Sequence, residues 1–374
     1  MAVADEPMMW NALRRIGFLL AAALVWSTPA AGQQAATPAR TGQQVYETIC
    51  ITCHGPEGKG GINLELEKVI ALPDFTDCGF SSREPDGDWL AVAHGGGPSR
   101  GFSELMPAWG GAFTLDELQL AVTHLRTFCG ETGWPRGELN LPLALVTGKA
   151  FPEDEAVVKV TGRDGDVVTR FVYERRFGAL NQWEIAVPVA SVEDAANGRS
   201  TGLGDIALGY KRVLAHSLSR GNIASASAEV TLPSGSETDG RGAGTAIFEP
   251  FLTFGQMFPR EAFLQAQAGF EIPFESGHDD EVFWRVAVGK TFEQGQFGRT
   301  WSPMLEVVAA MPMVSDADID WDVVPQMQVS LNKRQHIRLN AGARIPVNNT
   351  GERSTSVIVY LLWDWFDGGF LDGW

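Results

Sequence analysis

From about Glu153 to Phe366, apolar and polar residues alternate with a period of two. The clearest segments are residues 264–272 and 337–345, where every second residue is apolar. Such alternation is typical of β-strands with one apolar and one polar face. About twelve such segments follow one another, most of 9–13 residues, centred near residues 158, 172, 186, 208, 227, 250, 267, 287, 306, 327, 341 and 360. That length matches the roughly 9–11 residues of a tilted membrane-crossing strand and exceeds the usual ~5–6 residues of soluble sheets.

The connections between these segments also alternate. One set is short and often basic, at residues 178–181, 216–221, 258–261, 294–299 and 333–335. The other set is longer on average and acidic, at residues 191–202, 234–244, 275–281 and 312–322. Short turns on one side and long loops on the other are typical of an outer-membrane barrel, and an even strand count places both barrel ends on the short-turn, periplasmic side. The alternative fold is a two-sheet β-sandwich, which usually has shorter strands.

Aromatic residues near the ends of these segments fit the girdles of such a barrel. They are Trp183, Phe254, Phe258, Trp284, Trp301, Trp321, Trp363 and Trp365. We therefore predict an all-β antiparallel barrel of about twelve strands over residues 153–374.

The overall charge limits the partners of the chain. With 46 acidic and 29 basic residues its net charge is −17, which excludes a general affinity for nucleic acid. The acidic loops could gather metal cations or simply form a solvated surface. The run of Asp316, Asp318, Asp320 and Asp322 has the spacing of a calcium loop but lacks the glycine turn and closing glutamate of an EF-hand. No phosphate loop, nucleophile–base set or paired catalytic carboxylates stand out.

Residues 1–32 have the layout of a secretory signal peptide. Arg14 and Arg15 precede an apolar run, Ile16 to Trp26, and small residues at 30–32 offer a cleavage site. The alternative is a buried core helix. Residues 33–40 form a polar segment. Export places the mature chain in the periplasm or beyond, where disulfides persist.

The motif Cys50-Ile51-Thr52-Cys53-His54 is the C-x-x-C-H pattern of covalent haem attachment. Two thiols on one turn can add to the two vinyl groups, and the next imidazole can then meet the iron from the same side. A redox pair or half of a zinc site is the alternative. The predicted export, the lack of a second C-x-x-C and the adjacent histidine argue against both the redox pair and the zinc site. We therefore predict one covalently bound haem c, held by Cys50 and Cys53, with His54 as an iron ligand.

Residues 41–130 resemble class I cytochrome c domains, which are all-α. The resemblance rests on Cys50 to Gly60, on the segment Met106-Pro107-Ala108-Trp109-Gly110, and on a final helix with Leu125 and Phe128. It implies that Met106 is the second axial ligand, a pairing with histidine that raises the reduction potential. The alternatives are Met106 as a core residue, or His94 or His124 as the ligand. With both axial positions filled by protein, the domain should pass electrons rather than bind oxygen.

Two further cysteines, Cys78 and Cys129, lie in this domain. In an oxidising compartment they could pair and tie the loop near residue 78 to the last helix. Residues 131–152 lack clear periodicity, and we interpret them as a linker to the barrel.

The second half resembles small outer-membrane transporter barrels, especially the phenol-degradation (MetA-pathway) porin-like family. The shared strand–turn texture is clearest in residues 202–211 and 228–235. The whole chain resembles cytochrome–porin fusions that oxidise iron at the cell surface. This resemblance implies electron transfer between a periplasmic carrier or dehydrogenase and a donor or acceptor at the outer membrane, with outer-membrane lipid around the barrel. The alternatives are a channel for a small solute, such as an aromatic one, with a tethered cytochrome, and a barrel that only anchors the cytochrome. We expect an electron-transfer protein without a catalytic site of its own, with metal oxidation or reduction at the surface as the alternative.

Overall fold

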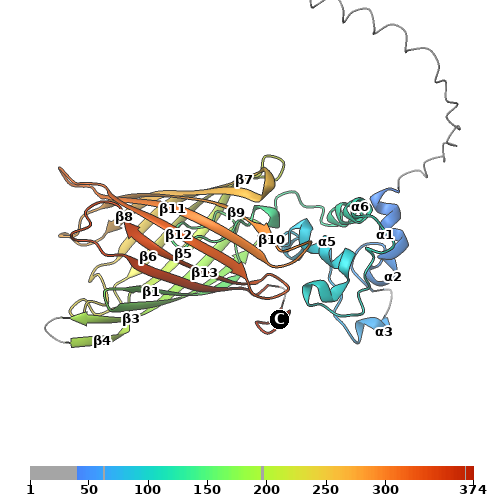
Figure 1. Ribbon diagram of the computed structural model, residues 1–374, viewed down its shortest axis with the longest axis horizontal. Helices are drawn as coiled ribbons and strands as arrows, with labels where there is room; N and C mark the ends of the chain where they lie inside the picture. Colours follow the sequence, from blue (N-terminus) through green and yellow to red (C-terminus); the bar gives the residue numbers. More distant parts are fainter. Residues whose placement is uncertain (1–39, 62–63, 195–197, 367) are drawn as a thin grey trace, which may run out of the picture. The chain divides into compact units, whose positions relative to one another are not determined.

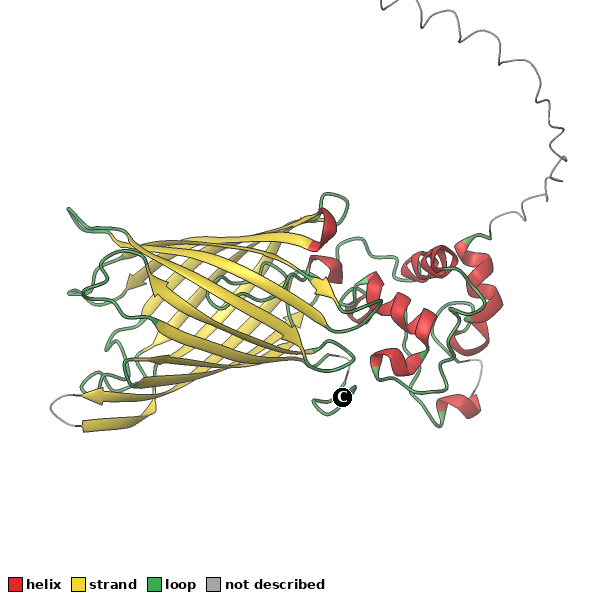
Figure 2. Ribbon diagram, in the orientation of Figure 1, coloured by secondary structure: helices red, strands yellow, loops and turns green. Residues whose placement is uncertain are grey.

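The computed structural model describes residues 40–61, 64–194, 198–366 and 368–374, which form a helical domain and a β-barrel (Figures 1 and 2). The predicted signal peptide and the polar segment up to residue 39 lie outside the described residues. No helix in the described part of the chain is long and apolar enough to cross a membrane.

The helical domain is organised by its first and last long helices. Thr41 and Thr114 begin these helices with capping boxes completed by Gln44 and Glu117. The two helices cross closely, since a Cβ on Gly42 would lie 2.1 Å from the Leu120 carbonyl oxygen. The helices are α1 (Gly42–Ile49), α2 (Ile51–His54), α3 (Leu64–Glu67), α4 (Cys78–Ser81), α5 (Asp86–Gly95) and α6 (Leu115–Arg126), with 3₁₀ turns η1 (Gly97–Arg100) and η2 (Gly137–Leu139).

The barrel is one closed antiparallel sheet, because β1 pairs with both β2 and β14. Its strands are β1 (Glu155–Arg163), β2 (Asp166–Phe177), β3 (Asn181–Asp194), β4 (Gly198–Leu203), β5 (Ile206–Ser217), β6 (Asn222–Leu232), β7 (Ile247–Phe258), β8 (Ala262–Pro273), β9 (Glu281–Lys290), β10 (Phe292–Glu293), β11 (Thr300–Pro312), β12 (Asp320–Ser330), β13 (Ile337–Pro346) and β14 (Ser356–Asp364), with η3 (Pro259–Glu261) between β7 and β8.

Fourteen described segments make twelve positions around the barrel. β4 and β5 both pair with β3 and form one strand interrupted at residues 204–205. β9 and β10 both pair with β11 and are interrupted at residue 291. The predicted barrel of about twelve strands is confirmed, and the sandwich alternative is wrong because the described strands form a single closed sheet.

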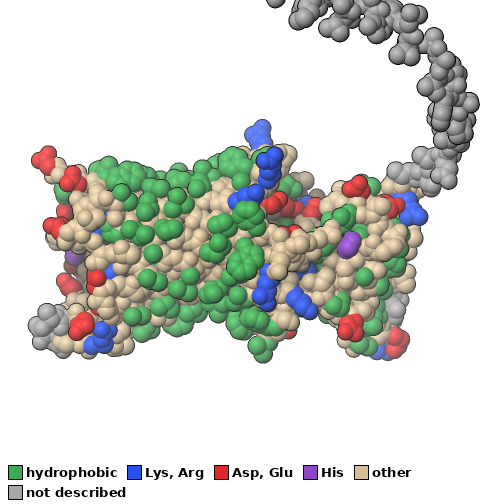
Figure 3. Space-filling view, in the orientation of Figure 1, with side chains coloured by type: hydrophobic (Ala, Val, Ile, Leu, Met, Phe, Trp, Pro, Cys, Tyr) green, Lys and Arg blue, Asp and Glu red, His purple; other side chains and the backbone are tan. Residues whose placement is uncertain are grey.

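The alternation along each strand separates the two faces of the barrel wall. On β11, Glu306 and Val308 are buried, whereas Leu305 and Val307 are 45% and 39% exposed. The outer surface repeats this pattern on strand after strand and carries a broad band of hydrophobic side chains (Figure 3). A soluble protein rarely exposes an apolar patch of that extent, and a membrane barrel requires one.

Large aromatic residues lie toward both ends of this band. Trp183, Trp301 and Trp363 are within three residues of a strand end on the short-turn side. Trp284 and Trp321 both lie near the long-loop ends of their strands, and their ring centroids are 5.6 Å apart. One connection departs from the predicted asymmetry, because β1 and β2 are joined on the long-loop side by only residues 164–165.

Residues 139–151, most of the second half of the segment predicted to be a linker, instead lie inside the barrel. Most of the side chains from Leu139 to Phe151, which we call the lumenal segment, are buried or half-buried. Its backbone binds inward-facing side chains: Leu145 N donates to Gln326, Thr147 N to Glu306 and Gly148 N to Gln267. Further bonds come from Lys159, Lys211, Ser225, Gln265, Gln328, Asn340 and Tyr360. These partners lie on eight strands around the wall, so the segment fills the lumen near the short-turn end.

Candidate haem site

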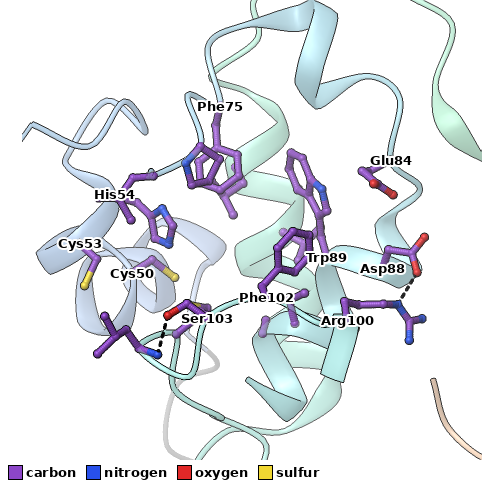
Figure 4. A pocket seen from close by; sticks show the side chains of 18 of the residues that line it. Cys50, Cys53, His54, Phe75, Glu84, Asp88, Trp89, Arg100, Phe102 and Ser103 are labelled. Carbon is purple, nitrogen blue, oxygen red and sulfur yellow. Dashed lines mark hydrogen bonds and ion pairs between the residues drawn. The ribbon is translucent and has the colours of Figure 1, made fainter. Parts of the chain in front are cut away.

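The three residues of the C-x-x-C-H motif are presented by one helical turn. Cys50 follows α1, while Cys53 and His54 belong to α2, and His54 N donates to Cys50 O at 3.0 Å. Both thiols are free of disulfides and half-buried. The local fold thus places two thiols and one imidazole on the same side of a cavity (Figure 4).

That cavity has a volume of about 470 Å³, within the roughly 300–1,000 Å³ of small-molecule and cofactor sites. Its lining is mostly apolar, with Trp89 and Val92 from α5 and Leu118 and Val122 from α6. A largely apolar cavity beside two thiols and a neutral imidazole suits a flat, apolar macrocycle with a central iron. The residues present therefore fit haem, with Cys50 and Cys53 to hold it covalently and His54 to bind its iron.

His54 is in the protonation state that a metal ligand needs. Burial lowers the pKa of His54 to about 4, so the imidazole is neutral at physiological pH. Its Nδ1 is buried without a hydrogen-bond partner among the described residues. The loop after it is fixed by the hydroxyl of Tyr46, which donates to Gly55 O at 2.5 Å, and by Gly60 N, which donates to His54 O at 2.8 Å.

The thiol environment does not favour the redox-pair alternative. Reactive C-x-x-C thiols have a lowered pKa. Burial, together with the nearby Cys53, raises the pKa of Cys50 to about 12. The Cys50 thiol is therefore a poor thiolate nucleophile in this fold.

Met106 lines the same cavity as His54, as the resemblance implied. Its segment is held against the end of α5, since Gly97 N donates to Met106 O at 2.9 Å and Trp109 N to Ala93 O at 3.1 Å. The two rival histidines lie elsewhere: His94 contacts Phe297, and His124 packs on Tyr46. Met106 as axial ligand remains a prediction that this arrangement favours.

Replacing Met106 by alanine should lower the midpoint potential by on the order of 0.1 V. A thioether opposite an imidazole raises the potential, and axial ligands act over a span of about 0.8 V. A redox titration of the haem α-band in the full chain measures the change. Met313→Ala, at an exposed barrel residue, is the matched control. An unchanged potential in the Met106 variant would give the axial role to another residue.

Cys78 and Cys129 are joined in the structure, with Cα atoms 5.2 Å apart. The bond ties α4 to the chain just after α6 and closes a loop with a sequence separation of 51. Replacing both cysteines by alanine should lower the free energy of unfolding of the helical domain by about 2–4 kcal/mol, the typical effect of such a cross-link. Denaturant titration followed by the haem spectrum measures it. Equal midpoints for the variant and the parent chain, both without reductant, would contradict the expectation.

In the described part of the acidic loops, no three acidic side chains lie close enough together to share one cation. Asp322 is buried and bound by Arg344 and Arg353, each within 2.6 Å. Among the described residues, three acidic side chains do lie close enough together to share an ion: Glu153, Glu155 and Asp364. The Lys149 ammonium already lies there, 3.0 Å from Glu155 and also paired with Glu153.

Three residues of the cavity come from outside the helical domain, and the sequence did not indicate them. Arg334 and His336 belong to the β12–β13 turn, and Asp372 lies near the C-terminus. In the sequence, this turn is recognisable only as short and basic. Their position depends on contacts between segments more than 200 residues apart, which leave no local pattern.

The fold and the site together define a class of protein: a c-type cytochrome domain joined to a closed antiparallel barrel of the outer-membrane kind. Residues 37–125 match the family model "Cytochrome C oxidase, cbb3-type, subunit III". No curated protein matches the chain.

Among solved structures, the barrel is similar to several outer-membrane proteins. A KdgM porin is 11% identical with a TM-score of 0.39, covering 56% of this chain and 98% of that one. A NanC porin is 7% identical with a TM-score of 0.41, covering 56% and 98%. The COG4313 outer membrane channel from Pseudomonas putida F1 is 11% identical with a TM-score of 0.41, covering 57% and 96%.

Proposed function

We propose that this protein is an electron carrier at the outer membrane, with its haem held on the periplasmic side of the barrel. One observation carries the proposal: the attachment motif and Met106 line a single cavity. When bound, haem supplies the one-electron couple. His54 and Met106 would both bind its iron, which leaves electron transfer as the chemistry of the site. A periplasmic carrier or dehydrogenase is the proposed partner on one side, and a donor or acceptor at the outer membrane on the other.

Contacts between the helical domain and the short-turn end of the barrel support this arrangement. Arg83 binds Asp154 at 2.5 Å, and His336 Nε2 lies 3.0 Å from Glu84. Arg100 donates to the Phe297 carbonyl at 2.6 Å. All three barrel partners lie in the connections that precede β1, β11 and β13 on the short-turn side. That side faces the periplasm in barrels of this kind, so the haem domain is proposed to lie there.

The barrel interior favours this function over an open solute channel. The lumenal segment is bonded to side chains on eight strands around the wall, as described above. Glu306, which is fully buried, accepts hydrogen bonds from both Val146 N and Thr147 N. A route for a solute would have to break several of these buried bonds, each worth about 0.5–1.5 kcal/mol net and more when one partner is left unsatisfied.

Redox spectra of intact cells test the proposal. The full chain is expressed with cytochrome maturation, and a membrane-impermeant reductant is added while the haem α-band is recorded. A prompt response that His54→Ala abolishes supports electron exchange across the outer membrane. A response only after permeabilisation of the outer membrane would contradict that exchange and leave a periplasmic cytochrome anchored by the barrel.

A further inference from the structure

The haem cavity has one charged end. Three pairs of a basic and an acidic side chain lie in its lining: Arg100 with Asp88 at 2.6 Å, His336 with Glu84 at 3.0 Å, and Arg334 with Asp372 at 3.7 Å. Arg100 and His336 are 3% and 5% exposed, so both side chains are largely withdrawn from water. Buried charges are costly unless they are paired or bind something.

The charged end lies opposite the attachment motif. Figure 4 shows Cys50 and Cys53 on one side, Glu84, Asp88 and Arg100 on the other, and aromatic side chains between them. Haem is divided in the same way as the cavity, because its two vinyl groups lie on one edge of the macrocycle and its two carboxylates on the opposite edge. With the vinyl edge held by the cysteines, the carboxylates would reach the charged end.

Two of the three basic side chains at this end belong to the barrel. Arg334 stacks over the Phe102 ring at 4.3 Å and donates to Gly101 O at 3.2 Å. His336 is fixed by its backbone, since its N–H donates to Asn332 Oδ1 at 3.1 Å. Asn332 in turn donates to Asp372 O, and Lys333 N donates to Gly373 O. The β12–β13 turn is thus braced on one side by the C-terminal residues and on the other by the helical domain.

We propose that Arg334 and His336 of the barrel bind the haem carboxylates together with Arg100, so that the barrel completes the haem site and helps set its potential. The inference rests on the proposed haem-binding function. Arginine suits a carboxylate because its planar group offers five donors in a fixed fork. Asp88, Glu84 and Asp372 hold the three basic side chains in place. A cation near the iron favours the reduced form, which carries one positive charge fewer.

The test compares the charge removed at the cavity with the same charge removed beside it. Arg334→Gln is made in the full chain, and Lys333→Gln is its matched control. Lys333 is the preceding residue of the same turn, is exposed, and lies outside the cavity lining. We expect Arg334→Gln to shift the equilibrium toward the oxidised haem by about tenfold, which is about 59 mV for one electron. Lys333→Gln should shift it less than twofold, because an exposed charge is screened.

Arg334→Lys distinguishes a potential shift caused by the lost charge from one caused by altered folding. It keeps the positive charge and should restore most of the potential, although it loses the planar fork. Equal shifts in Arg334→Gln and Lys333→Gln would overturn the inference and leave only a general charge effect. A shift in Arg334→Gln that Arg334→Lys does not reduce would also overturn it, because a purely structural role would then explain the result. Absence of covalent haem from the parent chain is a different outcome, since it would remove the proposed function itself.

Discussion

Replacing Cys50 and Cys53 by serine should abolish covalent haem in this protein. The two thiols are the only sulfur atoms in the C-x-x-C-H motif, and both line the cavity that the macrocycle would fill. Without bound haem, the largely apolar cavity of about 470 Å³ would be left unfilled. Haem-dependent peroxidase staining after denaturing electrophoresis measures the loss, which should be complete.

The matched control removes the other two cysteines. Cys78→Ala with Cys129→Ala should retain the stained band, because those sulfur atoms are bonded to each other and the variant lacks only a cross-link. Staining that persists in the serine variant would contradict covalent attachment at this motif. Staining lost in both variants would indicate that the haem depends on the fold of the domain rather than on these two thiols.

Replacing residues 141–148 by a Gly/Ser segment of equal length should open the barrel. The change removes side chains such as Leu141 and Leu145 that pack inside the lumen. It retains Lys149, so its ion pairs with Glu153 and Glu155 persist. We expect mean conductance in planar bilayers to rise on the order of tenfold, because twelve strands enclose more space than the ~8-strand barrels that side chains alone fill.

A similar change at the other end of the barrel is the control. A Gly/Ser segment at residues 313–319, which join β11 to β12 on the long-loop side, leaves the lumenal segment intact. It should leave conductance at the parent level. Equal, high conductance in the parent chain and both variants would mean that the lumenal segment does not close the barrel, and the solute-channel function would then lead. The haem spectrum of each variant reports whether the helical domain remains folded.

Much of this architecture follows from local patterns in the sequence. A period of two over 9–13 residues specifies a strand with two different faces, and each of the twelve predicted centres lies within a strand. Capping residues Thr41 and Thr114 and apolar residues at helical spacing specify α1 and α6. The haem motif is equally local, because one helical turn brings Cys50, Cys53 and His54 together.

Only the tertiary structure determines where the lumenal segment lies and which barrel residues line the haem cavity. Residues 139–151 have no periodicity, and their bonds to Glu306, Gln326 and Tyr360 join positions about 160–217 residues apart. Arg334 and His336 meet the helical domain only because the closed sheet brings the β12–β13 turn to the end where β1 begins. A pattern in sequence records which face of an element is buried. It does not record which distant segment covers that face, because closure of the sheet makes that choice.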